Sequence, residues 1–194
     1  MASAFTEQEK SAIRSALKET AQRCAATIGM RKTTVDQLAE SAGISKGAFY
    51  KFYEIKEYLF FEVLEDWHAE LYNAAWKMWE SRPDLPDPQR AAEAVLETCR
   101  VMERNSMMDF FENDLPYLLR KIPAEDLNRH YHSDDVHIQE LIERMGVQLK
   151  QSPEVVSAVV RGLMLTLSHR KQIGDSYPQV LKLLVQGASE QLIA

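Results

Sequence analysis

The sequence predicts an all-α protein with a small N-terminal head of three helices, including a helix-turn-helix, followed by a larger helical body. Gly and Pro are scarce, with seven of each in 194 residues, and no segment alternates β-branched and polar residues with a period of two. Apolar residues instead recur at helical spacing behind capping signals. The chain is long enough to bury a substantial core, and we expect a boundary between residues 1–55 and residues 56–194.

The first expected helix begins after Thr6, because Thr6 and Glu9 have the spacing of a capping box. Gly29 should end this helix. Its apolar stripe should cover the back of the helix-turn-helix and consists of Ile13, Leu17, Ala21, Cys24, Ala25 and Ile28.

The stretch from Thr33 to Phe60, TTVDQLAESAGISKGAFYKFYEIKEYLF, has the layout of a helix-turn-helix. Thr34 and Gln37 form a capping box, and Gly43 stands where a left-handed turn ends the first helix. Ser45 is placed to cap the second helix, whose Phe49 should point inward. The alternative is a plain helical hairpin with a solvated basic face.

The outer face of the second helix is small, polar and basic. Gly47 and Ala48 allow a close approach of the backbone, while Lys46, Tyr50 and Lys51 surround them. Such side chains reach phosphates or base edges, and a recognition helix enters the major groove by its N-terminal residues.

Charge is distributed unevenly along the chain. Residues 1–56 hold nine Lys/Arg and six Asp/Glu, a net charge of +3, whereas residues 57–194 hold 14 and 23, a net charge of −9. The total of −6 argues against indiscriminate nucleic-acid binding, and the asymmetry limits DNA contact to the head.

The body should consist of further helices in sequence. A long helix from Lys56 to about Ser81 ends at the Pro-rich connector 82–88, and another helix covers residues 88–105. Residues 106–123 should form one or two helices interrupted near Pro116, and a polar segment around residues 130–137 should lead into a helix ending by Gly146. Two amphipathic helices, opened by Ser152-Pro153 and by Ser176 with Pro178, complete the chain.

The run TTVDQLAESAGISKGAFYKFYEIKEYLF resembles the N-terminal DNA-binding domain of the TetR family of bacterial repressors, and the likeness covers roughly residues 8 to 60. The preceding helix and the pair Lys56-Glu57 fit the family as well. The resemblance implies that Tyr50 and Lys56 bind phosphates. It also implies a DNA-facing set of Thr34, Ser45, Lys46, Gly47, Ala48 and Lys51. Ile55, Ala48 and Phe52 depart from common family residues and leave the operator sequence open.

The resemblance further implies a homodimer, in which the last two helices pair with their mates in a four-helix bundle, so that two heads read a palindrome. Gly162 and Gly187 would permit close approach there. The expected interface residues are Val156, Val159, Val160, Leu163, Leu167, Leu181, Leu184, Val185 and Ala188.

A cluster rich in Met and aromatic residues is the expected pocket for a small apolar or amphipathic ligand, as the resemblance implies. It comprises Trp67, Leu71, Met102, Met107, Met108, Phe110, Phe111 and Tyr117. The alternative is a Met-rich core without a cavity. Asp109, Glu112 and Asp114 would select a cationic ligand, or else form a solvated acidic face.

No metal, cofactor or catalytic site is expected. His130, His132, Asp134, Asp135 and His137 do not place three ligands on one helical turn in a recognised pattern, and a polar loop with a helix start is the default there. The sequence has no Gly-rich phosphate loop, nucleophile elbow or zinc-protease helix. It has neither a signal peptide nor a membrane-spanning run, which fits a cytoplasmic protein.

These observations give the hypothesis of a homodimeric repressor that binds a palindromic operator in double-stranded DNA and is released by a small effector. Two alternatives stay open. One is an all-helical small-molecule-binding or enzymatic protein with an incidental basic head, and the other is an activator on the same fold.

Overall fold

The computed structural model describes residues 5–194, and this part of the chain is helical and contains no strand. The first four residues of the expected 1–55 head lie outside the described residues. The elements in order are α1 (Glu7–Thr27), α2 (Val35–Ser41), α3 (Lys46–Phe49), α4 (Lys56–Ser81), α5 (Asp87–Arg104), the π-helix η1 (Phe110–Asp114), α6 (Leu115–Lys121), α7 (Ala124–Met145), α8 (Pro153–Leu165), the 3-10 helix η2 (Thr166–His169), α9 (Arg170–Ile173), the 3-10 helix η3 (Gly174–Ser176) and α10 (Tyr177–Leu192). The predicted all-α class is confirmed.

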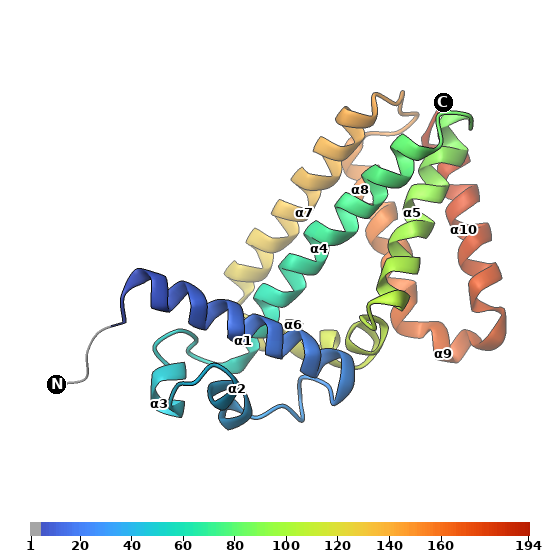
Figure 1. Ribbon diagram of the computed structural model, residues 1–194. Helices are drawn as coiled ribbons and strands as arrows, with labels where there is room; N and C mark the ends of the chain where they lie inside the picture. The colour runs from blue at the N-terminus through green and yellow to red at the C-terminus, as the bar shows by residue number, and fades with distance from the viewer. Residues whose placement is uncertain (1–4) are drawn as a thin grey trace.

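Helices α1, α2 and α3 form a head at one end of the molecule (Figure 1). Both predicted capping boxes are present, from Thr6 to Glu9 and from Thr34 to Gln37. Gly43 has a φ of +66°, as expected for the turn between α2 and α3. Leu17, Leu38 and Phe49 are fully buried where the three helices meet. On α1, however, Cys24 is only half-buried and Ile28 is exposed, so these two members of the expected stripe lie outside the buried face.

Helix α4 joins the head to the body. It leaves the head and runs between α5 and α7, and it packs on both (Figure 1). Ile55 offers no side-chain cap to α4, as its apolar side chain predicts. The buried cluster is continuous from Leu17 in α1, through Leu59 and Trp67 in α4, to Val185 in α10. Because the two parts share α4 and one core, the boundary at residue 56 stays a prediction.

The body differs from expectation in two places. The irregular turn in the Met-rich segment is η1, and Pro116 lies in the first turn of α6, where a missing N–H costs nothing. Helix α7 begins at Ala124, so residues 130–137 lie in mid-helix and do not form a polar loop.

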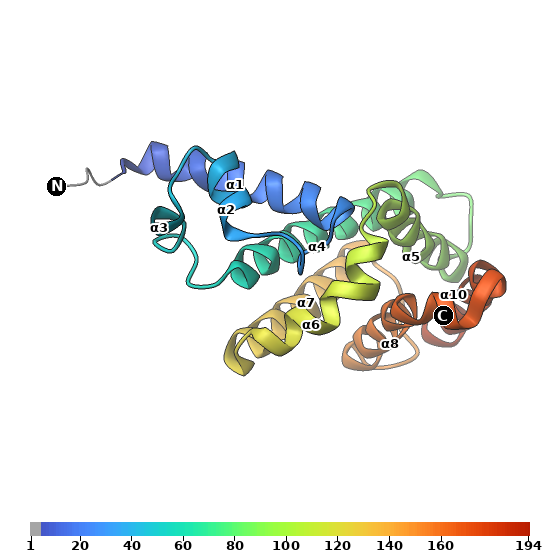
Figure 2. The ribbon, with the colours of Figure 1, turned by 90° about the horizontal axis from the view of Figure 1, so that it is seen from below.

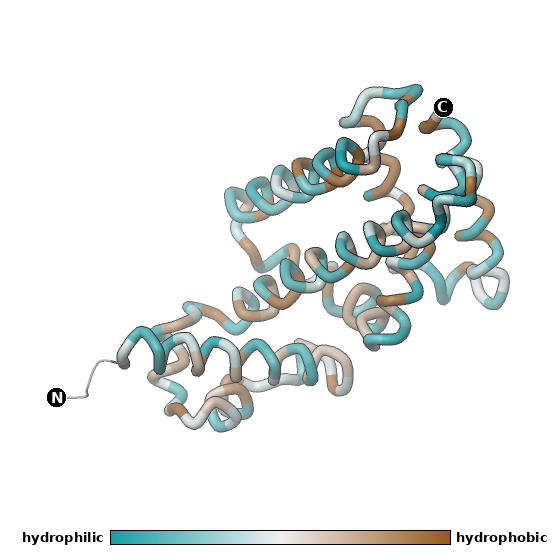
Figure 3. The backbone as a smooth tube through the Cα atoms, turned by 45° about the horizontal axis from the view of Figure 1, so that its top comes forward, coloured by the Kyte–Doolittle hydropathy of each residue, from teal (hydrophilic) through white to brown (hydrophobic). Residues whose placement is uncertain are grey.

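Seen from below, α8 and α10 lie together on the side of the body away from the head (Figure 2). Hydrophilic and hydrophobic residues alternate along the helices, as amphipathic packing requires (Figure 3). Among the described residues, no helix combines the length and apolar character needed to cross a membrane.

Candidate nucleic-acid interface and effector groove

The N-terminal end of α3 presents an open surface on the head. Ser45 caps the helix, with its Oγ accepting a hydrogen bond from the Ala48 amide at 3.1 Å. Phe49 is fully buried beneath, which fixes the rotation of α3. The outward residues are Lys46, Gly47, Tyr50 and Lys51, which are exposed, and Ala48, which is half-buried. The residues predicted to face DNA on α3 therefore share one surface.

Three exposed residues of this surface, Gly47, Lys46 and Lys51, differ in the contacts that they make within the protein. A Cβ built on Gly47 would meet only the Ser45 Oγ, at 4.0 Å, so nothing in the protein itself requires a glycine there. The Lys46 ammonium lies 2.8 Å from the Asp36 carboxylate in the first turn of α2, and this hydrogen bond raises the pKa of Lys46. Lys51 has no ion-pair partner within residues 5–194.

Thr34 is exposed at the start of α2, but its hydroxyl already serves the capping box. It accepts from the Gln37 amide at 3.2 Å and donates to Gln37 Oε1 at 3.1 Å. A DNA contact by Thr34 would therefore involve its methyl group or its remaining lone pair.

Lys56 has a different environment from the one expected for a phosphate-binding residue. Its Nζ donates to the backbone carbonyls of Met30 at 2.9 Å, Arg31 at 3.2 Å and Thr33 at 2.6 Å. An ammonium has three donors, and all three are used inside the protein. In the protein alone, Lys56 thus has no free donor for the expected phosphate contact and holds the loop between α1 and α2 against the start of α4. The sequence carries no signal of this, because the three carbonyls converge only in the fold.

The same loop is held from the body by Asp114 at the end of η1. Asp114 is 3% exposed, and its carboxylate accepts from the Met30 amide at 2.6 Å and from Arg31 Nε at 3.0 Å. Gly29 has a φ of +82°, and a Cβ there would lie 3.0 Å from Asp114 Oδ2. We call residues 29–33 the head loop. It is fixed by α4 on one side and by η1 on the other.

Of the three acidic residues expected to select a cation or form a solvated face, Glu112 and Asp114 are paired within the chain, whereas Asp109 is exposed. Besides the pairing of Asp114 with Arg31, Glu112 is paired with Arg170 and, at 2.7 Å, with Lys171. Burial would raise the pKa of Glu112, but hydrogen bonds from Lys171 and Arg170 outweigh it and lower that pKa.

The predicted ligand cluster is packed core. The Trp67 and Phe110 rings meet edge to face with centroids 5.1 Å apart, and Phe60 stacks on Phe110 at 6.5 Å. Seven of the eight residues are buried, and Tyr117 is partly buried. This burial fits the alternative of a Met-rich core, and a ligand pocket among these residues stays a prediction.

A groove of about 510 Å³ lies instead on a different face of α4, between α4 and α7. Its lining is polar and aromatic, and consists of Glu65, His68, Ala69, Tyr72, Asn73, Trp76, His130, Ser133, Asp134, His137, Glu140, Leu141 and Arg144. Sequence reasoning missed this site because it placed the histidines in a loop. Once residues 124–145 are one helix, the spacing of His130, Asp134 and His137 puts all three on one face.

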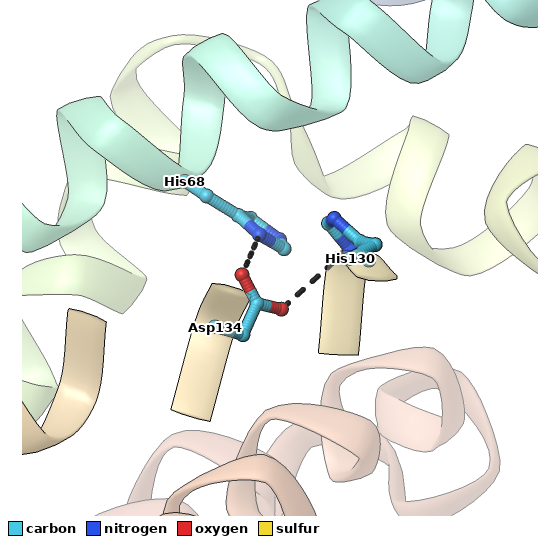
Figure 4. Close-up of side chains that lie close together, drawn as sticks. All are labelled: His68, His130 and Asp134. Carbon is cyan, nitrogen blue, oxygen red and sulfur yellow. Dashed lines mark hydrogen bonds and ion pairs between the residues drawn. The ribbon is translucent and has the colours of Figure 1, made fainter. Parts of the chain in front are cut away.

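Two histidines and a carboxylate meet in this groove (Figure 4). His68 Nδ1 is 3.0 Å from Asp134 Oδ1, and His130 Nε2 is 3.5 Å from Asp134 Oδ2. Burial, partly offset by the Asp134 charge, lowers the pKa of His130, which favours neutral imidazole. Burial alone would raise the pKa of Asp134, but its hydrogen bond with His68 and nearby charge lower it. Neutral imidazole and ionised carboxylate are the forms that bind metal ions.

The expected dimer residues on α8 and α10 divide into two groups. Val156, Leu167, Leu181 and Val185 are buried within the chain, so they belong to its own core. Val159, Val160, Leu163 and Ala188 are half-buried, and Leu184 is exposed. The large apolar residues that face outward are Val155, Leu165, Leu183 and Leu184, with exposures of 44–63%. Gly162 and Gly187 are exposed, and a Cβ on either would meet no atom within 4 Å.

Comparison with known proteins agrees with this architecture. The family model described as "Bacterial regulatory proteins, tetR family" matches residues 17–63, which run from α1 into α4. A search of curated proteins by sequence found no match.

Solved structures resemble the chain over nearly its whole length. A transcriptional regulator from Rhodococcus sp. Rha1 is 19% identical, with 92% of this chain and 95% of that one covered and a TM-score of 0.56. RolR in complex with resorcinol is 19% identical, with coverage of 96% and 95% and a TM-score of 0.61. FadR from Thermus thermophilus, a TetR-family transcriptional repressor in complex with lauroyl-CoA, is 18% identical, with coverage of 92% and 94% and a TM-score of 0.57. Residues 17–63 thus form a DNA-binding-type domain of the TetR family of bacterial regulatory proteins, and the chain as a whole has the fold of solved structures described as TetR-family transcriptional regulators.

Proposed function

We propose that this protein is a transcriptional repressor that binds a palindromic operator as a homodimer and is released by a small effector. The observation that carries the proposal is the open N-terminal surface of α3 within a TetR-family domain. Tyr50 and Lys51 project from that surface, while Gly47 leaves room for the nucleic acid to approach the backbone.

In this proposal Lys51 and Tyr50 contact the phosphates. Lys46 is ion-paired with Asp36, so Asp36 partly neutralises the charge that Lys46 presents to the DNA. Lys56 supports the head loop and makes no phosphate contact. The net charge of the head is +3 against −9 for the rest of the chain, which orients α3 toward the duplex.

The second copy would bind on an apolar stripe along α8 and α10. Val155, Ala158, Gly162 and Leu165 are all exposed and follow one another at intervals of three or four residues along α8. Leu183, Leu184 and Gly187 extend the apolar surface on α10. Exposing about half or more of a leucine side chain to water is unfavourable in free energy, so a partner surface that covers it would be stabilising. The two glycines allow helices to approach closely. A two-fold pairing here leaves both heads free to read two half-sites.

The effector site we propose is the groove between α4 and α7. Relatives of the same fold bind small molecules, resorcinol in RolR and lauroyl-CoA in FadR. A ligand that fills the groove would shift α4 relative to α7. Since Lys56 of α4 and Asp114 of η1 both hold the head loop, such a shift would change the spacing of the two heads. Release requires only that the ligand bind better to the arrangement that fits the operator poorly.

The test is selection of duplexes from random DNA by the full-length protein. The proposal predicts an inverted repeat whose half-sites are separated by about one or two helical turns, roughly 34 Å each. Recovery of no preferred sequence, or of a single unrepeated half-site, would contradict an operator-binding homodimer.

A further inference from the structure

The geometry points to a binding site for a divalent transition metal ion, with Zn²⁺ the best-suited, formed by His68 of α4 and by His130 and Asp134 of α7. The three side chains face one another across the groove (Figure 4). The proposal that these residues bind a metal ion is independent of the proposed function, but a regulatory role for the ion rests on that function.

The ligand atoms already have nearly the spacing of a metal site. Zn²⁺ binds imidazole nitrogen and carboxylate oxygen at about 2.0–2.2 Å, so ligand atoms of a tetrahedral site lie about 3.3 Å apart. The nitrogen–oxygen distances are similar to this value, 3.0 Å from His68 to Asp134 Oδ1 and 3.5 Å from His130 to the other oxygen, Oδ2, of the same carboxylate. The candidate atoms all lie within 4.8 Å of one another, so small side-chain rotations would complete the site.

The scaffold supports these ligands with further polar groups. His130 and Asp134 are four residues apart on one helix, a spacing that holds two ligands on the same face. Glu65 lies 3.9 Å from His130 Nδ1, on the side of the ring away from Asp134, and the Tyr72 hydroxyl donates to Asp134 Oδ1 at 3.2 Å. In many zinc sites a carboxylate hydrogen-bonded to the second nitrogen of a ligating histidine fixes its tautomer and increases its basicity, and Glu65 would need to move closer by about 1 Å to do this.

The donor set also selects the kind of ion. Two imidazoles with one carboxylate suit Zn²⁺ and its first-row neighbours, whereas Ca²⁺ and Mg²⁺ prefer oxygen ligands alone. His130 is buried, while the side chains of His68 and Asp134 are 20% and 15% exposed, which leaves a way in from the groove. With three protein ligands, the fourth position would face the groove and accept water or a small molecule.

The ion would join α4 to α7 at mid-length. Without it, the two helices are joined here by hydrogen bonds of His68 and Tyr72 with Asp134 and by stacking of the His68 and His130 rings. With it, coordination from both helices would fix their separation. Because α4 also holds the head loop through Lys56, metal occupancy would select one position of the head.

The binding test uses full-length protein freed of metal by a chelator, then titrated with Zn²⁺ by calorimetry and with Co²⁺ by visible absorption. We expect one ion per chain and a Co²⁺ spectrum of four-coordinate type. His68→Gln should weaken Zn²⁺ binding by at least about 100-fold, because loss of a ligand exceeds the 10–100-fold effect of losing a supporting group. Asp134→Asn should do the same.

His132→Gln is the matched control, since His132 is exposed on the same helix and outside the cluster. It should bind Zn²⁺ like the unaltered protein. Should His130→Gln fail to fold, His68→Gln still decides, because His68 is partly exposed on the other helix. No Zn²⁺ binding by the unaltered protein, or equal loss in His68→Gln and His132→Gln, would overturn the proposed site.

A second measurement separates the metal site from the regulatory role. Binding to the selected duplex is compared with and without Zn²⁺, for the unaltered protein and for His68→Gln. A Zn²⁺-dependent change of at least about fivefold that is absent in His68→Gln supports a metal-responsive regulator. Zn²⁺ binding without any change in duplex affinity would overturn the regulatory role. Failure to bind any duplex would contradict the proposed function and leave the metal titration standing.

Discussion

Replacement of Asp114 by Ala should both destabilise the protein and impair operator binding. Asp114 belongs to the body, yet its carboxylate accepts from the backbone of Met30 and from Arg31 in the head loop. No other carboxylate approaches Met30 N in the described part of the chain. Removing Asp114 would therefore leave a buried amide unsatisfied and release one of the two restraints on the head loop.

The magnitude follows from the burial of the partners. Met30 is fully buried, so loss of its charged acceptor should cost about 1.5–3 kcal/mol. The Arg31 side chain is 57% exposed, and its share should be only about 0–1 kcal/mol. The total of about 1.5–4 kcal/mol corresponds to a fall in Tm of roughly 3–16 °C for a chain of this length.

Thermal unfolding monitored by circular dichroism measures the loss of stability, and a binding titration on the selected duplex measures the loss of operator affinity. Asp109→Ala is the matched control, because Asp109 precedes η1 but is exposed and only loosely paired with Arg170. It should change the stability by less than about 0.5 kcal/mol. The same Tm and duplex affinity in Asp114→Ala and Asp109→Ala would show that Asp114 does not hold the head loop.

Three further predictions test the head and the dimer. Lys51→Ala should lower the slope of log K against log salt concentration by about one, with little loss of stability. Lys56→Ala should cost about 1–3 kcal/mol of stability and leave that slope unchanged. Salt titrations of duplex binding measure the slope, and unfolding curves measure the stability. Gly29→Ala should destabilise by at least about 1 kcal/mol more than Gly43→Ala, since both have positive φ but only Gly29 faces a buried carboxylate at 3.0 Å; equal unfolding midpoints would disprove this. Leu183→Glu, 63% exposed, should give a folded monomer in sedimentation, and a persisting dimer would place the interface elsewhere.

The local structure of the head could be predicted from the sequence because it depends on neighbours in the chain. The capping boxes at Thr6 and Thr34 and the left-handed turn at Gly43 each involve residues within four positions of one another. The helical spacing of the apolar residues then predicted which face of α3 is outward, and the burial of Phe49 agrees with that prediction. The start of α4 at Lys56 was also predictable, since the apolar period is long and regular from there.

The candidate site in the body could not be predicted because its parts come from distant segments. His68 and Asp134 are 66 positions apart, and only the packing of α4 on α7 brings them together. The same holds for Lys56, whose three acceptors lie 23 to 26 positions earlier, and for Asp114, which reaches back 84 positions to Met30. Composition identified the Met-rich segment but did not tell a packed core from a cavity.

Gly47→Leu tests whether the open face of α3 contacts DNA. A Cβ at this exposed position would meet only the Ser45 Oγ, at 4.0 Å, and Leu forms helix better than Gly. We predict an unchanged or raised Tm together with a loss of at least about tenfold, or 1.4 kcal/mol, in affinity for the selected duplex. Unchanged affinity in a fully folded Gly47→Leu protein would contradict the account, because the added side chain would then occupy a surface that DNA does not contact.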